Sequence, residues 1–302
     1  MSHILVIGAS GFVGRPLVKA LLADGFAVRC LARNPAKVAD LAALGCEVVQ
    51  GDVSDPASVQ RAFDAVDAAY ISIHTLSPQQ AAPGQGFMDV ERYGLQNIVL
   101  ACRTHGVKRL IYLTSLGNTP DARSEWGRER WRTEQYLLSS GLDVTVIQPG
   151  QIVGVGGQGF NMMVSQAGRS PTLTIASKTQ KWRNIALDDL IYYLVGVLDE
   201  ARSYGQSYEV GSDDVLTHDQ MMDVAAEVLG RRPPVKVHLP VALLGGLAQL
   251  VERVGKLPRG AINGLLDGTD DMVGDPTPIR QILPRAPLTY RQAVERALDK
   301  EN

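Results

Sequence analysis

The segment from residue 8 to residue 14 has the residue types and spacing that could hold a dinucleotide phosphate. It reads Gly-Ala-Ser-Gly-Phe-Val-Gly, with a glycine at every third position. Small residues let a backbone approach a pyrophosphate, and a helix beginning here would add amide donors and the positive end of its dipole. An apolar, strand-like run at 3–7 precedes the segment and a helix-like run at 15–25 follows it, which is the context this chemistry requires. The residues predicted to hold the phosphates are Gly8, Ser10, Gly11, Phe12, Val13 and Gly14.

The end of the second predicted strand, at 27–33, indicates which dinucleotide would bind. An acidic residue about 20 positions after the glycines accepts hydrogen bonds from the ribose of NAD. This chain has Arg33 there, with Lys37 four residues later and no carboxylate between them. A 2′-phosphate would meet a guanidinium, so we predict NADP(H) in preference to NAD(H). The alternative is that Arg33 only ends a surface strand.

Two further strand ends carry polar candidates, because the carboxyl ends of parallel strands form the ligand crevice. Asp52 and Val53 follow the third strand, where the aspartate could face an adenine or serve as a turn residue. Ser72, Ile73 and His74 follow the fourth, where His74 could donate a proton or form a structural hydrogen bond. A stretch rich in Pro, Gln and Gly at 75–86 then predicts a mobile loop over the site.

Six alternations of strand and helix over residues 1–150 predict an α/β fold with a doubly wound, largely parallel sheet. After Gly150 the composition changes, and glycines at 154–159 predict a flexible stretch. We expect two domains, a dinucleotide-binding domain at 1–150 and a smaller α+β substrate-side region at 151–302. Parts of the second region, at about 184–211, are expected to return to the first domain.

The composition excludes several classes of protein. The 302 residues carry a net charge of −2, which gives no electrostatic footprint for nucleic acid. Three scattered cysteines predict free, buried thiols rather than disulfides or a metal site. The apolar segment at 239–251 is interrupted and too short to span a membrane, so it predicts core packing or a docking surface. We expect a cytoplasmic protein without a leader peptide.

The motifs together resemble the extended and atypical short-chain dehydrogenase/reductase superfamily, over nearly the whole chain. They are the glycine loop, Gly51-Asp52-Val53, the run from Gly106 to Ser115, Pro149-Gly150, and Asp188-Asp189-Leu190. The nearest resemblance is to atypical NAD(P)H-binding members, among them NmrA-like regulators, isoflavone-reductase-like enzymes and an accessory subunit of respiratory complex I. The resemblance implies a Rossmann-type fold, cofactor contacts from Pro149 and Gly150, and Ser115 at the catalytic serine position.

The chain departs from the superfamily at the helix after the fifth strand, which carries Tyr-x-x-x-Lys in active extended members. Alignment on Glu134 and Gly141 puts Trp126 at the tyrosine position and Arg130 at the lysine position. Indole has no proton to exchange near neutral pH, and a guanidinium cannot relay one. Arg130 could still hydrogen-bond a ribose, and Ser115 could orient a carbonyl or be only a polar strand end.

Three functions follow from these observations. The first is an NADPH-dependent reductase of a small electrophilic substrate such as a quinone or enone, with a proton from His74 or water. The second is a regulatory or assembly protein that binds NADP(H) and a protein partner without turnover. The third, weakest because the tyrosine is missing, is a sugar-nucleotide epimerase or dehydratase. The expected assembly is a monomer or a homodimer.

Overall fold

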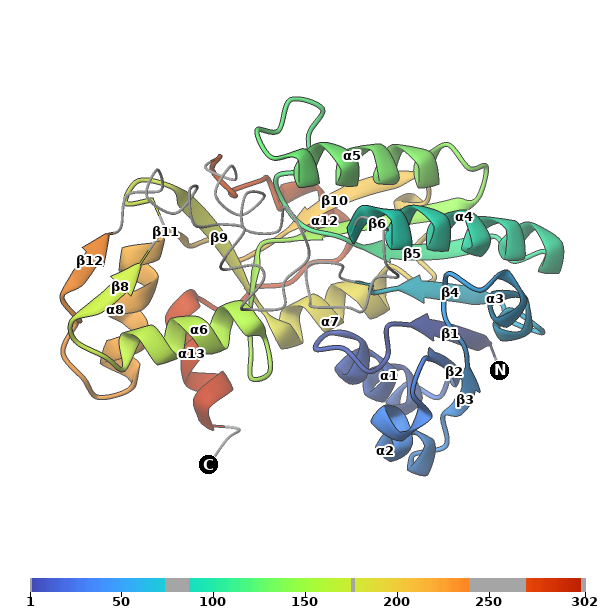
Figure 1. Ribbon diagram of the computed structural model, residues 1–302, viewed down its shortest axis with the longest axis horizontal. Coiled ribbons are helices and arrows are strands. Elements are labelled where there is room, and N and C mark those ends of the chain that lie inside the picture. The colour runs from blue at the N-terminus through green and yellow to red at the C-terminus, as the bar shows by residue number, and fades with distance from the viewer. Residues whose placement is uncertain (1, 74–86, 175–176, 239–269, 300–302) are drawn as a thin grey trace. The chain divides into compact units, whose positions relative to one another are not determined.

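The computed structural model describes residues 2–73, 87–174, 177–238 and 270–299 (Figure 1). The chain forms two compact units, each built from several segments. The first unit comprises Met1–Thr114, Glu129–Ile147 and Ile191–Tyr208, and the second comprises Ser115–Arg128, Gln148–Leu190 and Glu209–Asn302. The predicted division into domains at residue 150 stays a prediction.

A seven-stranded sheet organises the first unit, with the strand order β10-β6-β5-β4-β1-β2-β3. The pairings from β6 through to β3 are all parallel. The predicted α/β, doubly wound sheet is therefore confirmed. Its strands are β1 (His3–Ile7), β2 (Ala27–Ala32), β3 (Glu47–Gln50), β4 (Ala68–Ile71), β5 (Arg109–Leu113), β6 (Asp143–Pro149) and β10 (Gln206–Val210).

The strand order changes direction between β1 and β4. The chain runs from β1 outward to β2 and β3, and then returns to β4 on the other side of β1. Val6 of β1 pairs with Cys30 of β2 on one side and with Tyr70 of β4 on the other. A ligand crevice opens at such a switch point, beyond the carboxyl ends of the strands. The loops after β1 and β4 are therefore the ones that flank a bound ligand.

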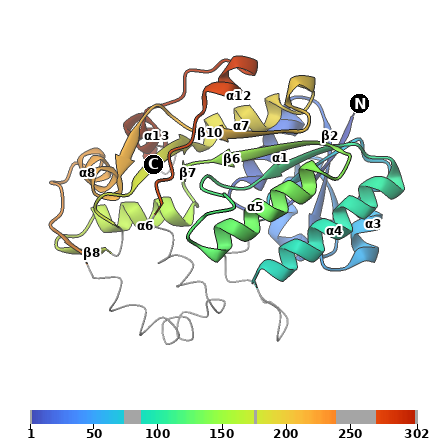
Figure 2. The same ribbon diagram turned by 90° about the horizontal axis from the view of Figure 1, so that it is seen from above.

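Helices cover both faces of this sheet. Figure 1 shows α1 and α2 on one side of the strands and α4 on the other, where Figure 2 shows it beside α3. Leu95, Ile98 and Val99 of α4 pack into a buried core with Phe63 and Leu110. The helices are α1 (Gly14–Ala23), α2 (Ala39–Ala43), α3 (Pro56–Ala62), α4 (Phe87–His105), α5 (Glu125–Leu138) and α7 (Leu187–Gly196), with 3-10 turns at Pro35–Val38 and Ala201–Ser203.

The second unit combines two small sheets with helices. One sheet has the order β11-β9-β7 and the other pairs β12 with β8. Its core joins α6, α8 and α13, with Phe160, Met222 and Val294 all buried. The elements are β7 (Gln151–Val153), α6 (Gln158–Ala167), β8 (Thr172–Thr174), β9 (Lys181–Ala186), β11 (Val215–Thr217), α8 (His218–Val228), β12 (Lys236–His238), α12 (Thr277–Ile282) and α13 (Tyr290–Asp299).

The flexible stretch predicted at 154–159 is wrong in its second half, because α6 begins at Gln158. Gly157 has an extended conformation there and precedes the first helical residue. Phe160, Met163 and Ala167 bury one face of α6, and that packing outweighs the low helix propensity of the glycines. By contrast, α8 begins with a capping box, in which Thr217 and Gln220 exchange both hydrogen bonds.

Three expectations lie outside the described residues: His74, the loop at 75–86 and the apolar segment at 239–251. Among the residues that are described, no helix is both long enough and apolar enough to cross a membrane.

The core of the first unit gives a direct test of the fold. Leu110 is fully buried in β5, whereas Leu100 on α4 is 55% exposed. Leu110→Ala should lower the free energy of unfolding by about 2–5 kcal/mol, because it removes buried methyl groups and leaves a cavity. Leu100→Ala is the matched control and should change it by less than about 0.5 kcal/mol. Urea denaturation measures both, and equal losses would contradict this assignment of the core.

Candidate dinucleotide-binding site

The glycine loop after β1 is closed by backbone contacts that leave no room for side chains. Gly8 has a φ of +97°, and a Cβ added there would lie 2.3 Å from the Ser72 carbonyl oxygen. A Cβ on Gly14 would lie 2.1 Å from the Gly8 carbonyl oxygen. The Gly11 amide donates to that same oxygen at 2.9 Å and closes the turn. The loop therefore needs glycine at its first and last positions on steric grounds.

Ser72, which follows β4, packs its backbone against this turn. The Ser72 amide donates to the Ile7 carbonyl oxygen at 2.9 Å, which extends the pairing of β4 with β1. This bond brings the Ser72 carbonyl against Gly8 at the switch point of the sheet. Ser72 thus lies beside the glycine loop, and the predicted contacts of Ser72 and Ile73 with a cofactor stay a prediction.

Helix α1 begins inside the glycine loop and presents its first turn to it. Val13 is the residue before the helix, and no side chain caps the amides there. The first turn carries no acidic residue. Free amide donors at a helix N-terminus, with the positive end of the dipole, favour an anion. The cradle formed by Gly8, Gly11 and Gly14 and this helix start fit a pyrophosphate group.

Cationic side chains lie at the ends of β2 and its following turn. Arg33 is exposed, and its Nε lies 3.9 Å from Oδ2 of Asp52. Lys37 is also exposed, and its carbonyl oxygen accepts a hydrogen bond from the Arg15 guanidinium. Arg15 in turn pairs with Asp40 and holds the pKa of that carboxyl below its usual range. Arg33 and Lys37 thus lie exposed after β2, while Arg15 is held by Asp40.

Asp52 and Val53 are fixed by the elements around them. Oδ1 of Asp52 accepts hydrogen bonds from the Ser54 amide at 2.9 Å and hydroxyl at 2.7 Å, which is the turn role considered for this aspartate. The Asn97 side-chain amide on α4 donates to the Val53 carbonyl oxygen at 2.9 Å. A Cβ on Gly94 would lie 2.8 Å from a Val53 methyl group. Gly94 and Asn97, one helical turn apart, are positioning residues that the sequence prediction missed.

Arg130 is the largest fully buried side chain of the described residues. Its Nη1 donates to the Thr114 hydroxyl at 3.0 Å, at the carboxyl end of β5. A buried guanidinium is costly unless it is hydrogen-bonded, so this contact fixes where the charge lies. The position predicted from the superfamily's lysine therefore carries a permanent positive charge directed at the strand end. Thr114 was not predicted as a site residue, although it directly precedes Ser115.

Three further predicted site residues, Ser115, Pro149 and Gly150, belong to the second unit. Within the described residues, the buried hydroxyl of Ser115 has no hydrogen-bond partner, while its carbonyl oxygen accepts from Asn118 at 2.8 Å. The Pro149 carbonyl oxygen accepts from the Leu116 amide at 3.0 Å, which ties the loops after β5 and β6 together.

Gly150 follows Pro149 and is closely enclosed. A Cβ there would lie 2.1 Å from the Arg183 carbonyl oxygen, and the Gly150 amide donates to the Val210 carbonyl oxygen at 3.0 Å. Trp126 lies half-buried on α5. The glycine at 150 is therefore required by the packing of its own unit, whatever else it contacts.

The cysteines are free and buried, as predicted. Cys30 and Cys46 approach within 2.8 Å at their sulfur atoms, and hydrogen bonding and burial raise the pKa of Cys30. Burial raises the pKa of Cys102 to about 12. Raised pKa values keep the Cys30 and Cys102 thiols protonated at neutral pH and make them poor nucleophiles, whereas the hydrogen bond from Cys30 lowers the pKa of Cys46. Over the described ranges, no three His, Cys, Asp or Glu side chains gather as metal ligands.

The switch point, the glycine cradle and the helix start together define a dinucleotide-binding protein of the Rossmann type. A family model described as NAD(P)H-binding matches residues 8–178, more than half of the chain. The chain belongs to this NAD(P)H-binding family, and its resemblance to atypical short-chain dehydrogenase/reductase proteins is confirmed.

Comparison with known proteins gives relatives with different roles. The photosystem II assembly factor Ycf39 of Cyanophora paradoxa is 32% identical over 48% of this chain and 44% of its own length. A ceramide reductase of Caulobacter vibrioides is 28% identical over 78% of this chain and 73% of its own. An Escherichia coli NADPH-dependent quinone oxidoreductase solved with NADPH has the same fold, with a TM-score of 0.76 and 22% identity over 98% and 99% of the two chains. The chain thus spans less than half of the assembly factor.

The cradle can be tested with two glycines that share one backbone conformation. Gly8→Ala should abolish NADPH binding, because the new methyl group meets the Ser72 carbonyl and opens the turn. Gly25→Ala is the control, since Gly25 has a φ of +85° and nothing within 4 Å of its added Cβ. It should lose about 1 kcal/mol of stability from the left-handed conformation but keep its affinity. Calorimetric titration with NADPH measures both, and tight binding by Gly8→Ala would contradict the assignment.

Proposed function

We propose that the protein is an NADPH-dependent reductase of a small electrophilic acceptor of the quinone or enone type. The observation that carries this proposal is the glycine cradle after β1, together with the exposed Arg33 and Lys37 after β2. It supports binding of a dinucleotide with an added phosphate. The family assignment supports reductase chemistry, and the ceramide reductase and quinone oxidoreductase relatives are in line with it.

The preference for NADP(H) rests on charge at the end of β2. Arg33 is exposed and extends beyond the strand, and its nearest carboxylate, on Asp52, is 3.9 Å away and engaged with Ser54. A guanidinium binds phosphate oxygens through paired, charge-assisted hydrogen bonds. Lys37 adds a second cation close by in sequence. No acidic side chain stands at the usual position to accept from an unphosphorylated ribose.

The proposed reaction requires little acid catalysis from the protein's own side chains. NADPH, when bound, supplies a hydride, and the acceptor takes a proton to complete its reduction. Ser115 has a buried hydroxyl free to hydrogen-bond an acceptor oxygen and polarise it. Arg130 holds a fixed positive charge near Thr114 and cannot relay a proton. Quinones and enones suit this chemistry because water, or His74, can protonate the electron-rich product after hydride transfer.

Arg33 gives a test of cofactor preference. Arg33→Ala should weaken NADPH binding about tenfold or more and leave NADH binding nearly unchanged, because only NADPH carries the phosphate. Arg61→Ala, an exposed arginine on α3, is the control and should leave both affinities unchanged. Titration of each variant with both cofactors measures the ratio. A uniform loss for both cofactors would contradict the role of Arg33.

Ser115 gives a test of turnover. Consumption of NADPH should be measured against a panel of quinones and enones, and at least one should be reduced. Ser115→Ala should lower kcat about 10- to 100-fold and leave NADPH affinity unchanged, because one hydrogen bond to the developing oxyanion is lost. Ser139→Ala on the surface is the control. Tight NADPH binding without turnover of any acceptor would contradict the reductase proposal.

A second candidate is a regulatory or assembly protein that binds NADP(H) without turnover. One observation favours it: the match with the photosystem II assembly factor covers about half of this chain. The absence of a proton-relaying pair at Trp126 and Arg130 is compatible with it. The acceptor panel separates the two candidates, since this one expects binding of NADPH and a preference for one redox state of the cofactor without its consumption.

A further inference from the structure

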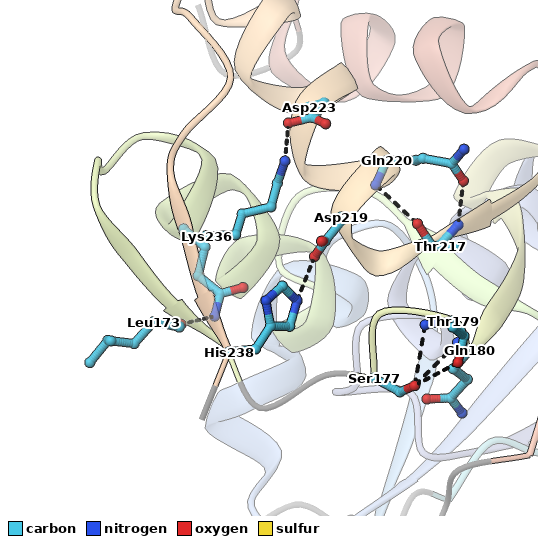
Figure 3. Close-up of polar contacts among 11 residues, drawn as sticks. Leu173, Ser177, Thr179, Gln180, Thr217, Asp219, Gln220, Asp223, Lys236 and His238 are labelled. Carbon is cyan, nitrogen blue, oxygen red and sulfur yellow. Dashed lines mark hydrogen bonds and ion pairs between the residues drawn. The ribbon is translucent and has the colours of Figure 1, made fainter. Parts of the chain in front are cut away.

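The two-stranded sheet formed by β8 and β12 in the second unit has polar side chains on the face toward α8 and apolar side chains on the opposite face. Residues on its inner face are polar, and Figure 3 shows Lys236 and His238 turned toward α8 while Leu173 points away. Lys236 pairs with Asp223 of α8. Nε2 of His238 lies 3.1 Å from Oδ1 of Asp219. The polar side chains of β12, Lys236 and His238, are therefore paired with carboxylates of α8.

The outer face of this sheet is apolar and exposed. Leu173 and Val237 are direct partners across the two strands, and Val235 lies two residues before Val237 on the same face. Their exposed fractions are 60% for Leu173, 41% for Val237 and 65% for Val235. Alternation along a strand places these three side chains together. Ordinary sheets bury such a row, so its exposure in the described residues requires a reason.

Arginines flank this apolar row. The segments 168–174 and 230–238 contain four cationic side chains and no carboxylate, in a protein with a net charge of −2. Lys236 faces inward, which leaves Arg169, Arg231 and Arg232, all exposed. The Arg231 guanidinium also donates to the Gly168 carbonyl oxygen and so joins the two segments. The two segments that carry the apolar face thus also carry exposed positive charge without a carboxylate.

We propose that this face docks on an anionic lipid bilayer. Exposed aliphatic side chains beside arginines match such a surface, since the apolar groups enter the headgroup boundary while the cations contact lipid phosphates. A protein partner would have to supply both an apolar groove and a carboxylate rim. The attachment would be peripheral, because only a few side chains on one face of two short strands take part. It would place the protein where water-insoluble acceptors are concentrated.

Co-sedimentation of the full chain with vesicles tests the proposal. The protein should bind vesicles that contain phosphatidylglycerol, bind pure phosphatidylcholine much more weakly, and dissociate as salt is raised. Leu173→Glu/Val235→Glu should lose this binding. The matched control is Leu44→Glu/Leu100→Glu, which adds the same charge at residues that are 57% and 55% exposed in the first unit, and it should bind like the wild type.

A second variant tests the arginines without touching the apolar row. Arg169→Gln/Arg232→Gln should weaken binding to the anionic vesicles about 25-fold, at about fivefold for each arginine. Three outcomes would overturn the proposal. They are equal binding to both vesicle types, unchanged binding by Leu173→Glu/Val235→Glu, and self-association of the wild type that this variant abolishes, which would make the face a contact between copies. NADPH affinity, measured alongside, should stay unchanged in every variant and keeps this test separate from the proposed function.

Discussion

The rest of the structure depends on one close contact between backbones, where the first turn of the glycine loop meets the end of β4. The Ser72 carbonyl and the Gly8 carbonyl occupy the space that side chains at Gly8 and Gly14 would need. This contact lets β1 and β4 pair in parallel up to their carboxyl ends while α1 starts immediately afterwards. The contact lies at the switch point of the sheet, directly before the helix start that could bind an anion. A nucleotide site is the direct result of this packing constraint.

The sequence was sufficient for the parts that depend on local patterns. Apolar runs at strand length and their alternation with helix-like runs predicted the parallel sheet correctly. It was insufficient where tertiary contacts decide, as in α6, whose glycine-rich start becomes helical because Phe160 is buried. The roles of Asn97 and Thr114 were missed for the same reason, because their partners, Val53 and Arg130, lie 44 and 16 residues away along the chain.

The cationic groups of the site favour binding of a cofactor, but they do not supply a proton for catalysis. Arg33, Lys37 and the start of α1 offer positive charge to a phosphorylated dinucleotide without a competing carboxylate at the usual position. The buried guanidinium of Arg130 donates a hydrogen bond to the Thr114 hydroxyl and cannot relay a proton. The proposed reductase therefore relies on geometry and on a reactive acceptor, with Ser115 as the polar group available to it. Its chemistry would be narrower than that of relatives with a tyrosine and lysine pair.

The central claim is that this cradle and its cationic edge bind NADPH in preference to NADH. Calorimetric titration of the wild-type protein with each cofactor, at one ionic strength near physiological, tests it most directly. We expect one site per chain and an affinity for NADPH at least about tenfold higher than for NADH. Equal affinities, or tighter binding of NADH, would contradict it.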